Sequence, residues 1–126
     1  MHRLLTLMLM VSMPVAAAEP AGSMPVRFQG EWAAGPAYCG SEIDDTAITI
    51  RAKRIIYWES DGPIKAVVVN GKNEVALIAE LSGEGDTWLA TAQFKLSDDG
   101  NRLTSISDSG REIVRYRCPQ RARVSG

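Results

Sequence analysis

Apolar and polar residues alternate with a period of two through most of this chain, which is the pattern of strands buried on one face. The clearest example is 87–96, where Trp88, Phe94 and Leu96 share one side with two alanines. Segment 73–81 has the Ala, Leu and Glu content of a helix, but its length and the parity of its apolar residues favour a strand. Further short strands are predicted within 26–32, 48–50, 54–60, 64–69, 102–106 and 111–118.

Turn signals separate these segments, and the strongest are Asp61-Gly62, Asn70-Gly71, 82–85 and 98–101. Eight short strands joined by tight turns, with no segment long enough for a crossover helix, predict an all-β fold. We expect an eight-stranded antiparallel up-and-down (meander) barrel over 26–118, because closing the sheet removes its exposed edges. A two-layer β sandwich is the alternative.

Two details of the last strands follow from side-chain parity. Leu103 and Ile106 have opposite parity within one predicted strand, which indicates a bulge or a bend there. In the final strand, Val114, Tyr116 and Cys118 share one parity, and we expect that face to point to the core.

The first eighteen residues resemble a secretory signal peptide. His2 and Arg3 give a positive start, Leu4 to Val11 is apolar apart from one threonine, and three alanines end the segment. This apolar run is too short to cross a bilayer core of about 30 Å, so no membrane span is expected. We therefore expect a periplasmic or secreted protein with a flexible leader at 19–25 and a loose C-terminal tail at 119–126.

Export would allow the two cysteines to form a disulfide, because disulfides persist in oxidising compartments. Cys39 lies near the expected mature N-terminus and Cys118 near the C-terminus. We expect a Cys39–Cys118 disulfide that staples a small domain. The two cysteines do not have the C-x-x-C spacing of redox-active pairs, so we expect the disulfide to be structural.

The expected cleavage also removes His2, the only histidine. Without an imidazole or a free thiol, Ser-His and Cys-His catalysis and histidine-based zinc sites are close to excluded. The formal net charge of −1 offers no basic field for nucleic acid. The acidic loops at 42–45 and 98–101 lack a complete calcium-ligand pattern. We expect no enzyme activity, no cofactor and no metal.

Three aromatic residues are candidates for contact with a ligand or partner: Tyr57, Trp58 and Trp88. In a small β domain, burial in the core is the more common fate of such residues. Tyr57 and Trp58 have opposite parity, so one of them should face outward and be the better contact candidate.

The motif Gly30-Glu31-Trp32 in the first strand, followed by a meander and a last strand that carries Arg115 and Arg117, resembles the calycin superfamily of lipocalin-like and avidin-like barrels. That resemblance implies that Trp32 packs across the base of the barrel, with Arg115 or Arg117 as its partner. The chain is also similar to small uncharacterised exported proteins of bacteria. Its size and single disulfide resemble barrel-type periplasmic inhibitors of proteases and lysozyme.

Three functional hypotheses remain, from different classes. The first is a non-enzymatic module that binds or inhibits an envelope protein such as a hydrolase, through the leader at 19–25 or a loop end. The second is a carrier of a small apolar ligand, which requires a pocket inside the barrel. The third, placed last, is a carboxylate-based hydrolase. Glu59 and Asp61 are the nearest to a carboxylate pair, but we expect them to be solvent-facing turn residues. The first is preferred, because many large side chains should already fill so small a barrel.

Overall fold

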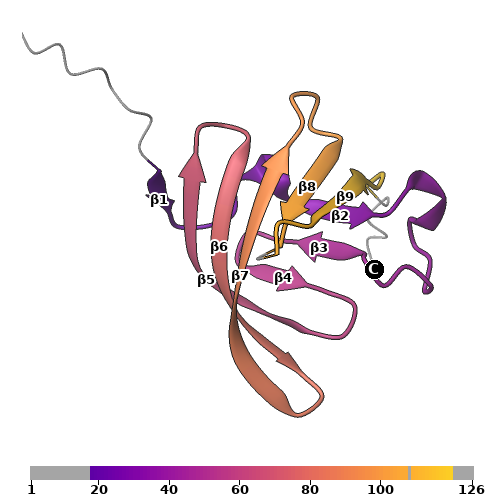
Figure 1. Ribbon diagram of the computed structural model, residues 1–126, viewed down its shortest axis with the longest axis horizontal. Helices are drawn as coiled ribbons and strands as arrows, with labels where there is room; N and C mark the ends of the chain where they lie inside the picture. The colour runs from indigo at the N-terminus through magenta and orange to yellow at the C-terminus, as the bar shows by residue number, and fades with distance from the viewer. Residues whose placement is uncertain (1–17, 108, 121–126) are drawn as a thin grey trace, which may run out of the picture.

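The computed structural model describes residues 18–107 and 109–120 (Figure 1). Within these ranges the chain forms nine β-strands and two short 3-10 helices, η1 (Val26–Phe28) and η2 (Pro36–Tyr38). The strands are β1 (Glu19–Ala21), β2 (Gly30–Ala33), β3 (Ile48–Ile50), β4 (Arg54–Ile56), β5 (Asp61–Asn70), β6 (Glu74–Gly83), β7 (Asp86–Leu96), β8 (Arg102–Ile106) and β9 (Glu112–Arg117).

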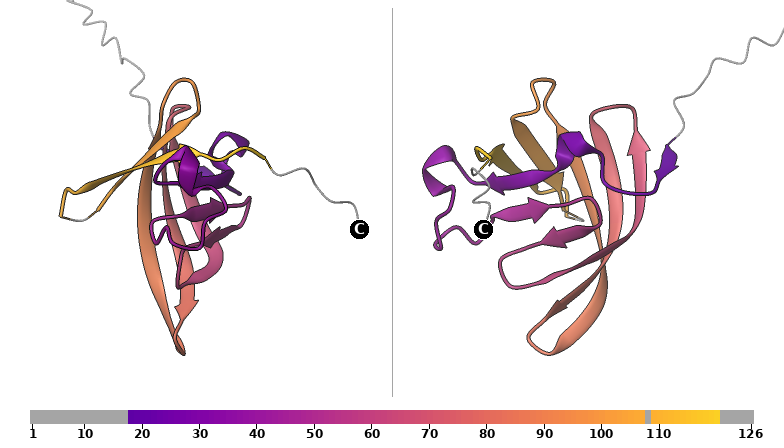
Figure 2. Two further views of the ribbon diagram at one scale, coloured as in Figure 1. Left: turned by 90° about the vertical axis from the view of Figure 1, so that its right-hand side faces the viewer. Right: turned by 180° about the vertical axis from the view of Figure 1, so that it is seen from behind.

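Eight of the strands form a closed antiparallel barrel. From β2 to β9 each strand pairs with the next along the chain, and β9 returns to pair with β2. The predicted meander barrel is therefore confirmed, and the structure is not a two-layer sandwich. The additional strand β1 pairs with β5 outside this ring, beside the part of β5 that β4 does not reach (Figures 1 and 2).

The three long central strands follow the sequence pattern closely. Residues 74–81 of the segment 73–81 belong to β6, as its parity predicted. β5 ends at Asn70 and Gly71 adopts a φ of +63°, in agreement with the predicted turn. The loop predicted at 82–85 narrows to Glu84 and Gly85, whose φ values of +50° and +83° match the type I′ turn that suits a two-residue hairpin.

The barrel interior is filled by apolar side chains from β2 to β8 and from the segment that precedes β2. Trp32, Phe28 and Met24 are the largest of them, each 1 % exposed. The remaining buried members of this cluster are Ile48, Ile50, Ile55, Val67, Val75, Leu77, Ala79, Leu81, Phe94, Leu96 and Leu103. The alternation read from the sequence identifies the inward side of β3, β6 and the second half of β7 correctly.

The segment from 26 to 32 is not one strand. Val26–Phe28 is a 3-10 turn in which Val26 is 81 % exposed while Phe28 is buried, and β2 begins only at Gly30. Gly30 adopts a φ of +129°, a conformation that side chains other than glycine rarely accept. The chain therefore bends at this glycine, and the period-two alternation does not extend across it.

The predicted turn at Asp61-Gly62 is also wrong. Both residues lie in β5, and the chain reverses earlier, where the Tyr57 N–H donates to the Ser60 carbonyl at 2.8 Å. A Cβ at position 62 would lie 1.8 Å from the Glu80 carbonyl oxygen, so this position needs glycine for close strand packing. The same residue type serves turns and close packing, which explains the error.

The leader expected at 19–25 contributes to the barrel instead. Glu19–Ala21 forms β1 against Val67, Val68 and Val69, and Met24 is buried in the core. Met24 gives this segment of small residues an apolar side chain that packs in the core. The signal peptide expected at 1–18 and the tail expected at 119–126 lie largely outside the described residues, which include only Ala18, Pro119 and Gln120 of them.

The irregularity expected within 102–106 is absent from β8, whose pairing with β7 and β9 runs in unbroken register. A register shift occurs instead in β5, between Ile64 and Ala66. Among residues 18–107 and 109–120, no helix combines the length and apolar character needed to cross a membrane.

Candidate functional site

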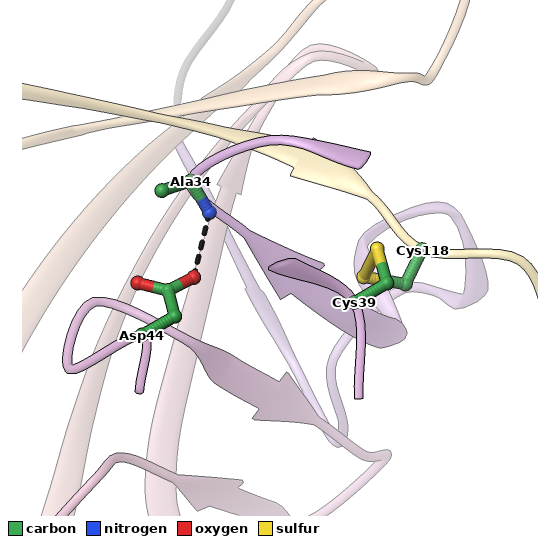
Figure 3. The surroundings of a disulfide bond; sticks show 4 residues. All are labelled: Ala34, Cys39, Asp44 and Cys118. Carbon is green, nitrogen blue, oxygen red and sulfur yellow. Dashed lines mark hydrogen bonds between the residues drawn. A yellow bond between two sulfur atoms is a disulfide. The ribbon is translucent and has the colours of Figure 1, made fainter. Parts of the chain in front are cut away.

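A disulfide links the two ends of the barrel sequence. Cys39 and Cys118, 79 positions apart, are bonded with their Cα atoms 5.6 Å apart, which confirms the predicted pairing (Figure 3). The Cys118 N–H donates to the Glu31 carbonyl at 2.8 Å, directly after the end of β9. The disulfide thus attaches the loop that follows β2 to the last strand, where β2 and β9 close the barrel.

Asp44 holds the other side of this loop. Its carboxylate is buried and accepts the Ala34 N–H at 2.8 Å, the Thr46 N–H at 3.0 Å and the Thr46 hydroxyl at 2.6 Å (Figure 3). Burial raises the pKa of this carboxyl, but the three hydrogen bonds, aided by the charge of Arg115, outweigh burial and leave its pKa below the ordinary value. The acidic residue is therefore part of the loop structure.

Trp32 and Arg117 are partners in the β2–β9 pairing that closes the barrel, and their side chains are in contact. The Arg117 guanidinium lies 4.3 Å from the centre of the Trp32 ring, and the Trp32 Nε1–H donates to the Phe28 carbonyl at 3.0 Å. Arg117 also donates to the carbonyls of Gly100, Gln29 and Arg27, at 2.8, 2.8 and 2.5 Å. The resemblance implied Arg115 or Arg117 as the partner of Trp32, and Arg117 is the arginine that contacts its ring. Burial lowers its pKa.

Arg115 points inward at a different place. It is 5 % exposed and donates to the Thr46 carbonyl at 2.5 Å and to the Ser105 hydroxyl at 2.9 Å. Desolvation lowers the pKa of Arg115, opposed by the neighbouring Tyr57 and Asp44, and burial raises the pKa of Tyr57. Tyr57 is partly buried and packs against the apolar core, and it also lines a hollow at the surface.

This arrangement corrects the prediction for the last strand. Val114 and Tyr116 are 38 % and 40 % exposed, while Arg115 on the opposite parity is buried. Apolar character alone favoured the wrong face of β9. The inward arginines are stabilised by carbonyl groups from distant loops, a contribution that no local pattern in β9 reveals.

Trp58 lies on the outside of the barrel wall, as one of the pair with Tyr57 was expected to. It is 47 % exposed and, with Tyr38, lines a surface hollow of about 290 Å³ over β2, β3 and the end of β4. Tyr38 is 44 % exposed and immediately precedes Cys39, so the disulfide and Asp44 position it. Sequence reasoning missed Tyr38, although an aromatic beside a half-cystine was the available signal. The other lining residues include Glu31, Ala33, Ser41, Ala47, Thr49 and Ile56.

Trp88 belongs to a separate region. It is 42 % exposed and lines a hollow of about 300 Å³ with Glu59, Ser60 and Glu84, where the β4–β5 loop meets the β6–β7 turn. Phe94 lines a third hollow, of about 250 Å³. The structure therefore brings two of the three predicted contact residues together: Tyr57 and Trp58 both line the hollow beside Tyr38, whereas Trp88 lines a different one.

The acidic loops are explained by their hydrogen bonds. Asp99 accepts from the Ser97 hydroxyl at 2.6 Å and from the Asn101 N–H at 3.0 Å, which is ordinary turn chemistry. In the part of the chain that the structure describes, no group of three or more His, Cys, Asp or Glu side chains is arranged to hold a metal ion.

Comparison of the sequence with models of known families, with curated proteins and with solved structures finds no match. The hollow beside Tyr38 and Trp58 is the surface feature of this chain that best fits a binding site.

Proposed function

We propose that this protein is an exported, non-enzymatic binding module that binds an envelope protein, such as a hydrolase, and inhibits it. The observation that carries the proposal is the outward pair Tyr38 and Trp58 beside a hollow of about 290 Å³. Exposed aromatic residues at the edge of a depression are typical of protein interfaces, where they supply large contact area at low cost in side-chain entropy.

The location of this hollow supports a macromolecular partner over a ligand inside the barrel. The interior is occupied by the cluster around Trp32, Phe28 and Met24, whereas Trp58 lies on the outer surface. A filled barrel offers its wall and loops for binding. A protein partner can cover both aromatic rings and the surrounding polar rim together.

The loop that carries Tyr38 is held in place before any partner arrives. The Cys39–Cys118 disulfide holds one side, and the hydrogen bonds of Asp44 hold the other. A pre-organised loop loses less conformational entropy on binding, which increases affinity without new contacts. The disulfide also supports the proposed compartment, because such bonds persist outside the reducing cytosol.

The proposal includes a calycin-like identity for the barrel. The tryptophan of Gly30-Glu31-Trp32 lies under Arg117 from near the chain end, the arrangement that the resemblance to calycins implies. The closed meander of eight strands agrees with that plan.

The test is a panel of envelope proteases, lysozymes and amidases, each assayed for inhibition and for direct binding by the disulfide-bonded protein. Trp58→Ala and Tyr38→Ala should each weaken binding about tenfold or more if these residues are central contacts. Trp88→Ala is the matched control, since Trp88 is similarly exposed but lines another hollow. It should bind like the parent protein.

The proposal fails if no enzyme of the panel is bound or slowed. The assignment of the binding surface to Tyr38 and Trp58 also fails if Trp88→Ala weakens binding as much as Trp58→Ala does. Circular dichroism of each variant shows that the barrel is intact.

A further inference from the structure

Over most of its length, β7 pairs with a neighbouring strand on one side only in the part of the chain that the structure describes. β7 pairs with β6 from Asp86 to Lys95 without a register break, but with β8 only at Phe94, Lys95 and Leu96. In residues 18–107 and 109–120, no other strand pairs with the β8 side of residues 87–92, which we call the β7 edge. The long β6–β7 hairpin and the β8–β9 hairpin point in different directions, so the two strands β7 and β8 diverge (Figure 2).

The direction of the backbone groups on this edge follows from the bonds beside it. The Ser97 N–H donates to the Arg102 carbonyl on the β8 side, and the Leu96 N–H donates to the Asn73 carbonyl on the β6 side. Because these directions alternate along a strand, the N–H and C=O groups of Thr87, Leu89 and Thr91 point to the β7 edge. They form a row of available donors and acceptors.

The side chains of this edge carry none of the features that usually block strand addition. Residues 87–94 read Thr-Trp-Leu-Ala-Thr-Ala-Gln-Phe, without charge, proline or glycine. Leu89 is 70 % exposed, and the strand has no bulge. Proteins normally protect such edges with lysine, proline, bulges or a covering segment.

We propose that the β7 edge pairs antiparallel with the same edge of a second copy of this chain, giving a two-fold dimer with one sheet continuous across both barrels. In a pairing centred on Ala90, Leu89 opposes Thr91 of the partner subunit, and both residues present edge-directed backbone groups. Residues of the same parity thus meet, as the antiparallel ladder requires. No like charges oppose each other in the uncharged segment, which makes it self-complementary.

This inference is independent of the proposed function. The β7 edge lies on the β6–β7 hairpin, whereas Tyr38 and Trp58 line a hollow over β2, β3 and β4. None of residues 87–92 lines that hollow. Loss of one property and not the other can therefore be recognised.

The experiment is sedimentation velocity of the disulfide-bonded protein from low to high micromolar concentration, for the parent and three variants. Leu89→Lys and Thr91→Lys place a charge on the β7 edge and should weaken association about tenfold or more. Ile78→Lys is the matched control: Ile78 is 41 % exposed and directly opposes Thr91 within the barrel, but it lies on β6, away from the edge. It should dimerise like the parent.

Amide hydrogen exchange gives a second measurement that does not depend on a variant. The amides of Leu89 and Thr91 should become protected as concentration rises, while those of Trp88 and Ala90, directed to β6, stay protected throughout. A parent protein that is monomeric at every concentration overturns the proposal. So does a dimer that survives both edge substitutions, or protection of these amides only after an envelope extract is added.

Discussion

Two of the short strand pairings in the barrel are reinforced very differently. β2 and β9 pair only through Trp32 with Arg117 and Ala33 with Tyr116, and β7 and β8 pair only at three positions of each strand. The β2–β9 pairing is supplemented by a disulfide, by the three carbonyl contacts of Arg117 and by the bond from the Cys118 N–H to the Glu31 carbonyl. The β7–β8 pairing ends at Phe94 and leaves the β7 edge open.

The two pairings are reinforced differently because they have different roles in the fold. The β2–β9 pairing closes the ring and joins segments far apart in sequence, so it must compensate for a large loss of chain entropy with few ladder bonds. Side chains and sulfur supply that stabilisation. The β7 edge is supported by the adjacent β6 partner along its whole length, so the hairpin stays folded without help from β8. Substitutions at the two places should therefore have very different effects.

Removing the disulfide should have the largest effect. The double variant Cys39→Ala/Cys118→Ala should lower the free energy of unfolding by about 4 kcal/mol, since a loop of 79 positions gives about 4.5 kcal/mol in the chain-entropy model. Urea denaturation followed by tryptophan fluorescence measures this. Glu42→Ala, in the same loop, is the control and should change stability little. A loss below about 1 kcal/mol would contradict the role given to the disulfide.

Arg117→Met should have the next largest effect, about 2–3 kcal/mol, because it leaves the carbonyls of Gly100, Gln29 and Arg27 without their donor and removes the cation from Trp32. Urea midpoints at constant slope measure it. Arg111→Met, an exposed arginine next to β9, should stay within about 0.5 kcal/mol of the parent. Equal losses for both variants would mean that Arg117 has no special role in closing the barrel.

Asp44→Asn should cost about 2 kcal/mol at neutral pH, because an amide nitrogen cannot accept the Ala34 or Thr46 N–H. The folded pKa of Asp44 lies below its unfolded value, so its contribution is complete above about pH 4 and is lost as pH falls through the folded pKa. The parent and the variant should therefore converge in stability at acid pH. Asp45→Asn, an exposed neighbour, should show no such convergence. A difference independent of pH would contradict this account of the carboxylate.

Much of the fold was predictable because β3, β6 and β7 each carry a complete local signal. Their alternation identifies the strand and its buried face, and turn chemistry limits their ends. The disulfide was predictable from compartment and number of cysteines. These inferences need only one segment at a time, or one pair of residues.

The errors arose where a distant group decides the local outcome. Gly62 lies in a strand because the Glu80 carbonyl approaches too closely for a Cβ. Arg115 faces inward because Thr46 offers its carbonyl. Tyr38 lines the candidate site because its loop is held against the barrel wall by a disulfide between two cysteines that are 79 positions apart in the sequence. No periodicity within β5, β9 or the loop contains that information.

The smallest effect should come from the turn of the β6–β7 hairpin. Glu84 has a φ of +50°, which asparagine tolerates better, and Asn-Gly is the preferred pair for a type I′ turn. Glu84→Asn should therefore stabilise the hairpin by about 0.5 kcal/mol.

Because β8 does not support this end of β7, the gain should appear as slower hydrogen exchange at β6–β7 amides near the turn, with little change in the urea midpoint. Gly85→Ala is the opposing control: its φ of +83° disfavours a side chain, so the same amides should exchange faster. If both variants changed the exchange of β2 and β9 amides equally, the hairpin would not open independently of the ring, and the distinction between the two pairings would fail.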